Sequence, residues 1–207
     1  MIDITLAIQA GGLSTRMGQD KALMLFLGKP LIEHILARIL DSFVPAEILV
    51  VTNYPSKYYF LENLYPIHLV CDILPGKGAL GGLYTSLKQA TYPLVSIAAC
   101  DLPFCNPDII LHGFEELNQV GGDVFLPYSQ NGLEPLYAVY RRDTCLPYIK
   151  ASIDNDILKV TAWFSHITVR EWRVSPSEVI SFFNVNTPQE FEQAEQIARL
   201  NQNIRIG

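Results

Sequence analysis

Residues 6–22 read LAIQAGGLSTRMGQDKA: an apolar run ends at Gln9, and glycines, hydroxyl residues and two cations follow it. The apolar run predicts a buried strand over Ile4–Gln9, and the glycine pair predicts a loop directly after that strand. Open α/β sheets bind their ligands beyond the carboxyl ends of the strands. This stretch therefore predicts an α/β fold with a candidate ligand loop after its first strand.

The residue types in this loop suit a phosphate. Gly11 and Gly12 allow backbone N–H groups to approach an anion closely, because neither residue carries a Cβ. Arg16 can bind a phosphate through two parallel hydrogen bonds, and Lys21 is a compact cation for a phosphoryl oxygen. The residues alone leave a second interpretation open, which is an ordinary connection between a strand and a helix with incidental charges.

Two common phosphate motifs do not fit the loop. A Walker loop needs G-x-x-x-x-G-K-[ST], whereas the spacing from Gly12 to Gly18 is one residue too long and Gln19 stands where the lysine belongs. The dinucleotide motif G-x-G-x-x-G is not matched either. The loop therefore belongs to neither a P-loop NTPase nor a dinucleotide-dependent dehydrogenase.

Apolar runs rich in β-branched residues alternate with segments of helical period through the rest of the chain. This alternation predicts one domain over residues 1–207, with a mostly parallel sheet covered by helices. The predicted strands are Ile4–Gln9, Glu47–Thr52, His68–Cys71, Leu94–Ala99, Val124–Leu126, Leu136–Tyr140, Ile167–Arg173 and Phe182–Val185. Amphipathic helices are predicted in PLIEHILARIL (30–40) and LGGLYTSLKQA (80–90), and further helices are predicted to start at Asn106-Pro107 and Thr187-Pro188.

Composition excludes several classes of function. The formal net charge is -6 and no basic run occurs, so the sequence lacks the basic face that nucleic-acid binding requires. The four cysteines have neither CxxC nor zinc-site spacing, which predicts reduced cysteines that mostly serve packing. The apolar stretch at the N-terminus is too short for a signal peptide, and no window is long enough to span a membrane. We expect a cytoplasmic protein with neither nucleic-acid nor membrane partners.

Two aspartates follow predicted strands. Asp101 ends the strand in LVSIAACDLPF, a position suited to Mg²⁺, which needs few carboxylates when substrate phosphates complete its shell. Asp72 ends another strand, before the glycine-rich turn in VCDILPGKGALGG, where it could accept hydrogen bonds from a nucleotide. The alternative for Asp101 is an Asx-type bend, and for Asp72 a long connection that needs glycines to turn.

Two regions of the second half are ambiguous. Asn184 and Asn186, at alternate positions of a predicted strand end, would point to one face and could bind a heterocycle or a phosphate. Asn186 could equally satisfy backbone groups ahead of the helix start at Thr187. The aromatic-rich stretch 133–174 is either the half that binds a second substrate or the far edge of the sheet.

Six motifs in this order carry a family resemblance: QAGGLSTRMGQDKAL, GKPLIEH, GALGGLYTSL, CDLPF, EPLYAVY and NVNTPQEF. Together they resemble the molybdenum cofactor guanylyltransferases, within the nucleotidyltransferases of glycosyltransferase-A-like fold. The resemblance covers nearly the whole chain. It implies a three-layer αβα sandwich with a Rossmann-like, mostly parallel central sheet, in which roughly residues 1–105 bind the nucleotide and roughly 106–207 bind the acceptor.

The resemblance also implies a reaction. The phosphate of molybdopterin attacks the α-phosphorus of GTP, which yields molybdopterin guanine dinucleotide and pyrophosphate with the help of Mg²⁺. The implied protein partners are molybdoenzymes or other proteins of cofactor biosynthesis. The implied GTP contacts are Gln9, Ala10, Gly11, Gly12, Lys21, Asn53, Asp72 and Asp101. The implied catalytic residues are Arg16, Lys21 and Asp101, with Asp101 also as the Mg²⁺ ligand and with Asn184 and Asn186 on the pterin side.

One position departs from the family, which more often has leucine where this chain has Gln9. If the residue contacts the base through its backbone, the change is mild; if its side chain faces the site, it affects base preference. Relatives that use CTP tend to have Ala-Ala-Gly in place of Ala10-Gly11-Gly12, so the extra glycine favours a purine. The alternatives are a nucleotidyltransferase that uses CTP or builds a sugar nucleotide, and a non-catalytic nucleotide-binding module.

Overall fold

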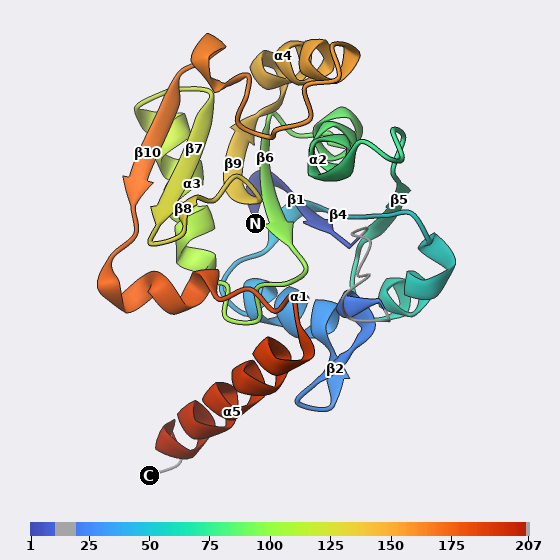
Figure 1. Cartoon of the computed structure of the whole chain (residues 1–207), viewed down its shortest axis with the longest axis vertical. Helices are drawn as coiled ribbons and strands as arrows, with labels where there is room; N and C mark the ends of the chain where they lie inside the picture. The colour runs from blue at the N-terminus through green and yellow to red at the C-terminus, as the bar shows by residue number, and fades with distance from the viewer. Residues whose placement is uncertain (11–19, 206–207) are drawn as a thin grey trace.

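The structure of the protein is a computed structural model that describes residues 1–10 and 20–205, with the backbone alone described at 201–205. One eight-stranded sheet runs between layers of helices (Figure 1). Its strands are β1 (Ile2–Gln9), β4 (Pro45–Thr52), β5 (His68–Cys71), β6 (Leu94–Ala99), β7 (Val124–Ser129), β8 (Gly132–Leu133), β9 (Tyr137–Arg141) and β10 (Val169–Arg173). A small separate hairpin joins β2 (Leu25–Phe26) to β3 (Lys29–Pro30).

The strand order is β10-β7-β9-β6-β1-β4-β5, with β8 paired to β7. β1 pairs in parallel with both β4 and β6, β5 pairs in parallel with β4, and β9 runs antiparallel between β6 and β7. The carboxyl ends of β1, β4, β5 and β6 therefore lie along one edge of the sheet. The predicted α/β fold with a mostly parallel sheet is confirmed.

The helices cover both faces and divide the core in two. They are α1 (Leu31–Leu40), α2 (Gly78–Gln89), α3 (Pro107–Gln119), α4 (Arg142–Asp154) and α5 (Pro188–Arg205). Apolar residues of α1, α3 and α5 pack in one buried cluster, and those of α2 and α4 pack in the other. Short 3-10 segments complete the fold: η1 (Lys21–Leu23), η2 (Pro55–Asn63), η3 (Phe164–His166) and η4 (Pro176–Phe182). This arrangement is the three-layer sandwich that the resemblance implies.

Both predicted helix starts are confirmed by their capping contacts. The Asn106 side chain accepts a hydrogen bond of 3.1 Å from the backbone N–H of Asp108 at the start of α3. At α5, Glu190 Oε2 accepts from the backbone N–H of Asn186 and Thr187, and Thr187 Oγ1 accepts from the N–H of Glu190. Such caps satisfy N–H groups that have no partner inside the helix.

The predicted strand Phe182–Val185 is wrong. Residue 182 ends η4, and 183–186 form an irregular segment in which Phe182 and Val185 are buried. This segment passes the end of β6, which already pairs with β1 on one side and β9 on the other. No strand edge is free there, and the backbone of this segment contacts the end of β6 through a hydrogen bond from Val185 N–H to Asp101 O at 3.0 Å.

The stretch 133–174 is not simply the far edge of the sheet. Its first strand, β9, lies inside the sheet between β6 and β7, whereas β10 forms the outer edge. The predicted strand Leu136–Tyr140 is thus confirmed within one residue at each end. Between the two strands the chain forms α4 and crosses in front of β9 (Figure 1).

All four cysteines are free thiols, as predicted. Cys100, Cys105 and Cys145 are buried, and burial raises the pKa of each to about 12. Cys71, at the end of β5, is exposed. The buried thiols therefore stay protonated and serve packing.

Candidate active site

Three polar side chains from distant parts of the chain meet at the carboxyl end of β6. The Lys21 ammonium donates to Asp101 Oδ2 and to Asn186 Oδ1, at 2.9 Å in each case. Lys21 begins η1, Asp101 follows β6, and Asn186 precedes α5. The lysine and aspartate side chains are 13% and 20% exposed, so the ion pair is only partly shielded from solvent.

The backbone around Asp101 is fixed from three directions. Cys100 N–H donates to Gln9 O of β1, and Val185 N–H donates to Asp101 O. On α1, Arg38 Nε donates to Cys105 O at 2.7 Å, and His34 Nε2 lies 3.2 Å from Pro103 O. The loop after β6 therefore takes its position from β1, from α1 and from the segment before α5.

One carboxylate oxygen of Asp101 has no partner among the described residues. Its Oδ1 is buried and accepts no hydrogen bond within residues 1–10 and 20–205. A buried acceptor in this state costs about 1–3 kcal/mol relative to a paired one. Such an atom is suited to a bound cation or to a donor on a substrate.

Tyr58 joins the two residues that border residues 11–19. Its fully buried side chain comes from η2, and its hydroxyl oxygen lies 3.2 Å from Ala10 O and 2.9 Å from Asp20 Oδ1. Burial and the charge of Asp20 raise the pKa of the Tyr58 phenol well above its usual value, so the hydroxyl remains a donor. One side chain thus connects the end of β1 to the residue before Lys21.

The Gln9 side chain is directed at α2. A methyl group added to Gly82 would lie 3.1 Å from Gln9 Oε1 and 3.2 Å from Cδ, so Gly82 leaves the space in which the amide lies. Gln9 Nε2 is buried, and within the described residues it has no hydrogen-bond partner. The amide nitrogen is therefore buried beside the start of α2, and a contact between this side chain and the base stays a prediction.

Asp72 shapes the turn that leads into α2. Its Oδ1 accepts from Leu74 N–H at 3.0 Å and from Thr85 Oγ1 at 2.7 Å. Thr85 is fully buried on α2 and also accepts from Ile73 N–H. Asp72 therefore holds the turn through one carboxylate oxygen, and a nucleotide contact through its other oxygen stays a prediction.

The remaining predicted residues are placed as follows. Gly11, Gly12 and Arg16 lie outside the described residues. Asn53 directly follows β4 and is half-buried at the same edge of the sheet as Asp101. Asn184 is half-buried and, because 183–186 is not a strand, it does not share a strand face with Asn186 as predicted.

Comparison with known proteins decides the family. Residues 6–167 match the model of the MobA-like NTP transferase domain. The chain belongs to this family. A protein of Natranaerobius thermophilus named probable molybdenum cofactor guanylyltransferase is 32% identical over 94% of this chain and 96% of its own length. A Clostridium perfringens protein of the same name is 30% identical over 93% of this chain and 96% of its own length.

Solved structures agree with this placement. The molybdopterin-guanine dinucleotide biosynthesis protein A of Archaeoglobus fulgidus has a TM-score of 0.79 and 26% identity, covering 94% of this chain and 98% of its own. A CMP:2-keto-3-deoxy-manno-octonic acid synthetase complexed with CTP has a TM-score of 0.77 at 15% identity, covering 97% and 100%, and so shows the shared fold alone. This MobA-like protein is a nucleotidyltransferase enzyme, as predicted.

A second carboxylate, that of Glu134, is affected by the charge of Asp101. Burial raises the pKa of Glu134 and the charge of Asp101 raises it further, while a hydrogen bond from Ser129 opposes both. Glu134 belongs to the EPLYAVY motif, whose letters do not predict this proximity. The sequence also did not predict the contacts of Tyr58 and Arg38, because the residues around each of them give no indication of a partner far away in the chain.

The Asp101 centre fits a divalent cation that is shared with a phosphate. Asp101 Oδ1 is buried and has no hydrogen-bond partner in residues 1–10 and 20–205, and Mg²⁺ binds through one or two carboxylates together with substrate phosphates. Within the described residues no group of three or more histidine, cysteine, aspartate or glutamate side chains could hold a metal by itself. No described helix is long and apolar enough to cross a membrane.

Proposed function

We propose that the protein transfers GMP from GTP to the phosphate of molybdopterin and releases pyrophosphate. The observation that carries the proposal is the meeting of Lys21, Asp101 and Asn186 at the carboxyl end of β6, in a fold whose relatives bear the name molybdenum cofactor guanylyltransferase. An oxygen of the acceptor phosphate attacks the α-phosphorus of GTP, and the bond to the β-phosphate oxygen breaks. Pyrophosphate takes the electron pair and leaves.

This chemistry needs positioning and charge more than it needs a base. The attacking phosphate is already anionic at neutral pH, so no proton has to be removed from it. Nucleotidyl transfer is accelerated mainly by orientation and by fixed charges on the phosphoryl oxygens. A partly exposed lysine between two acceptor side chains supplies such a charge.

Each residue has a role in the proposal. Lys21 offsets negative charge on the triphosphate, while Asp101 and Asn186 hold its ammonium in place. Tyr58 fixes the backbone on both sides of residues 11–19, where Arg16 is predicted to bind the same phosphates. The Gln9 amide nitrogen, which has no partner in the described part of the chain, donates to the base, so that the purine lies between the end of β1 and Gly82 of α2.

Asp101 Oδ1 is the atom that would hold Mg²⁺. When bound, this ion neutralises charge on the phosphate oxygens. Titration of the protein saturated with a non-hydrolysable GTP analogue, with Mg²⁺ and with Mn²⁺ and for both wild type and Asp101→Asn, tests this role apart from turnover. We expect the wild type to bind Mn²⁺ more tightly than Asp101→Asn does. Equal Mn²⁺ affinities of the two proteins would show that Asp101 is not a metal ligand.

Nucleotide competition tests the proposed donor. The purified protein is incubated with Mg²⁺ and molybdopterin in the presence of GTP, CTP, ATP or ITP, and the dinucleotide product is identified by mass spectrometry. We expect product and stoichiometric pyrophosphate with GTP and much less with the others. Faster product formation with CTP than with GTP would show that CTP is the nucleotide donor. GTP binding without any product would indicate a non-catalytic nucleotide-binding module.

A further inference from the structure

The segment after β8 brings a second carboxylate to the end of β6. β6 and β9 pair in antiparallel fashion, and at the end of this pair Ala99 N–H donates to Leu136 O at 3.0 Å. Asp101 lies two residues beyond Ala99, and Glu134 lies two residues before Leu136. The two carboxylates therefore extend from the same end of one strand pair.

Both the backbone and the side chain of Glu134 are held in place. Its N–H donates to Pro127 O at 2.9 Å, and its carbonyl oxygen accepts from Tyr137 N–H at 3.0 Å. Its Oε1 accepts from the hydroxyl of Ser129, a residue of β7 that is 3% exposed, at 2.5 Å. The Ser129 oxygen in turn accepts from Asn131 N–H. The carboxylate is therefore oriented before any ligand binds.

Each of the two carboxylates has one oxygen bound within the protein and one oxygen without a partner. Asp101 Oδ2 accepts from Lys21, and Asp101 Oδ1 has no hydrogen-bond partner in residues 1–10 and 20–205. Glu134 Oε1 accepts from Ser129, and Glu134 Oε2 accepts no hydrogen bond within the same residues. Two carboxylate oxygens at this end of the strand pair are thus left for a ligand.

The charges of the centre favour a ligand that is positive. Burial raises the pKa of Glu134, and the charge of Asp101 raises it further, so the two carboxylates lie within electrostatic reach of each other. Lys21 pairs with Asp101, whereas no lysine or arginine of the described residues forms an ion pair with Glu134. A partly buried charge is costly unless an opposite charge pairs with it.

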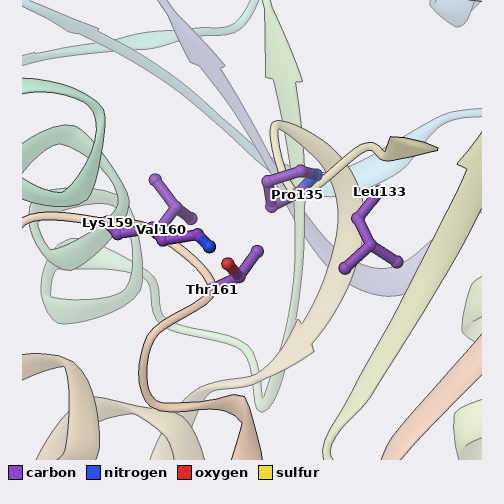
Figure 2. A pocket seen from close by; sticks show the side chains of 5 residues that line it. All are labelled: Leu133, Pro135, Lys159, Val160 and Thr161. Carbon is purple, nitrogen blue, oxygen red and sulfur yellow. The ribbon is translucent and has the colours of Figure 1, made fainter. Parts of the chain in front are cut away.

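The surroundings of Glu134 do not supply this positive charge. Its neighbours in the chain, Leu133 and Pro135, line a hollow together with Lys159, Val160 and Thr161 (Figure 2). The hollow is open to solvent, and Lys159 belongs to the segment across it, between α4 and η3. In the described part of the chain no ion pair joins Lys159 to Glu134. The charge of Glu134 is therefore left for a bound cation.

We infer that Glu134 is a second ligand of the divalent cation at the Asp101 centre, through its free oxygen Oε2. The inference rests on the proposed function, which requires Mg²⁺ beside the phosphates, and it adds a residue of the EPLYAVY motif to the cation site. Mg²⁺ takes one or two carboxylates together with substrate phosphates. Asp101 Oδ1 and Glu134 Oε2 supply the carboxylate oxygens, and the triphosphate supplies the phosphate oxygens.

Mn²⁺ binding in the presence of an uncleavable nucleotide tests the inference. The protein is saturated with the GTP analogue that has a methylene group between the α- and β-phosphorus, and bound Mn²⁺ is measured by electron paramagnetic resonance. Glu134→Gln keeps an acceptor for Ser129 and removes one unit of charge, so the Kd for Mn²⁺ should rise about 10-fold or more. Glu134→Asp keeps the charge and should lose less affinity. Glu115→Gln, at an exposed position of α3, is the matched control.

Two further measurements separate a cation ligand from other roles of Glu134. In EDTA, Glu134→Gln should bind the analogue no more weakly than the wild type does, and at saturating Mg²⁺ its KM for molybdopterin should equal that of the wild type. Equal Mn²⁺ affinities of wild type and Glu134→Gln would overturn the inference, whether or not dinucleotide forms. Weaker Mn²⁺ binding by this variant, in a protein that forms no dinucleotide, would contradict the proposed function alone. Failure of the wild type to bind the analogue would contradict both.

Discussion

The two sides of the Asp101 centre differ in how their polar groups are partnered. On the side of β1, β4 and α2, Lys21, Asp72 and Tyr58 are hydrogen-bonded within the protein, whereas Gln9 Nε2 has no partner among the described residues. On the side of β8 and α4, Lys159 and Glu134 Oε2 have no such partner in the described part of the chain. A group that is already held in place costs little reorganisation when charge develops, which suits the reacting phosphates.

The difference assigns separate tasks to the two sides. In the proposed function the first side holds the triphosphate in one geometry. Variants on the first side are therefore expected to alter turnover or GTP affinity, and variants of Glu134 on the second side are expected to alter the affinity for the divalent cation.

The largest effect is expected for the ion pair itself. Lys21→Met and Asp101→Asn should each lower kcat about 100- to 1,000-fold, because each removes a preorganised charge from the phosphates. Single-turnover measurements with saturating GTP and molybdopterin give this rate. Asp108→Asn, an exposed aspartate at the start of α3, serves as control, and a rate loss below 10-fold for Asp101→Asn would remove that residue from the centre.

A variant of Gln9 tests whether its side chain, at the end of β1, contacts the nucleotide base. Gln9→Leu keeps a similar shape and removes the buried amide, so the KM for GTP should rise roughly 3- to 10-fold through the loss of one hydrogen bond. The KM for molybdopterin should not change. Gln89→Leu, at the exposed end of α2, is the control, and wild-type values for GTP would show that the amide has only a packing role.

A variant of Tyr58 tests whether GTP binding requires the link between Ala10 and Asp20, the residues on either side of 11–19. Tyr58→Phe removes the hydroxyl next to Ala10 O and Asp20 Oδ1 and leaves the buried ring in place. We expect GTP affinity to fall roughly 3-fold, with molybdopterin affinity unchanged. The neighbouring Tyr59→Phe is a close control because Tyr59 is 57% exposed; equal behaviour of the two variants would contradict the role of Tyr58.

The smallest effect is expected in stability at Glu134. Burial raises its pKa above the unfolded value, so its contribution to the free energy of unfolding is greatest at low pH and declines as pH rises through the folded-state pKa. Glu134→Gln should therefore gain stability relative to wild type between pH 4 and pH 7, as measured by urea denaturation. Glu115→Gln, at an exposed position of α3, is the control; the same stability difference at both pH values would contradict this environment.

The sequence predicted the elements whose signals are local. The stripe Leu31, Ile32, Ile35, Leu36 and Ile39 has helical spacing, and it is the buried face of α1. The apolar run before Gln9 likewise gave β1, because a strand buried on both faces reads as a continuous apolar segment. Phe182–Val185 failed because its apolar pattern cannot reveal that the neighbouring strand edge is already occupied.

The site could be predicted only in part, and for a related reason. The family motifs named Lys21 and Asp101, but no local pattern shows that the two side chains touch across 80 positions of the chain. Tyr58 and Arg38 act on residues 38 and 67 positions away, and neither belongs to a motif. Polar contacts of this kind depend on the assembled sheet, whereas periodicity reports only on neighbours along the chain.

A positional label tests the central claim most directly. The protein is incubated with molybdopterin, Mg²⁺ and GTP that carries ³²P at either the α or the γ position. We predict that the α label enters the molybdopterin product, one per acceptor, and that the γ label leaves with pyrophosphate. A product that carries the γ label, or release of pyrophosphate without labelled product, would contradict guanylyl transfer.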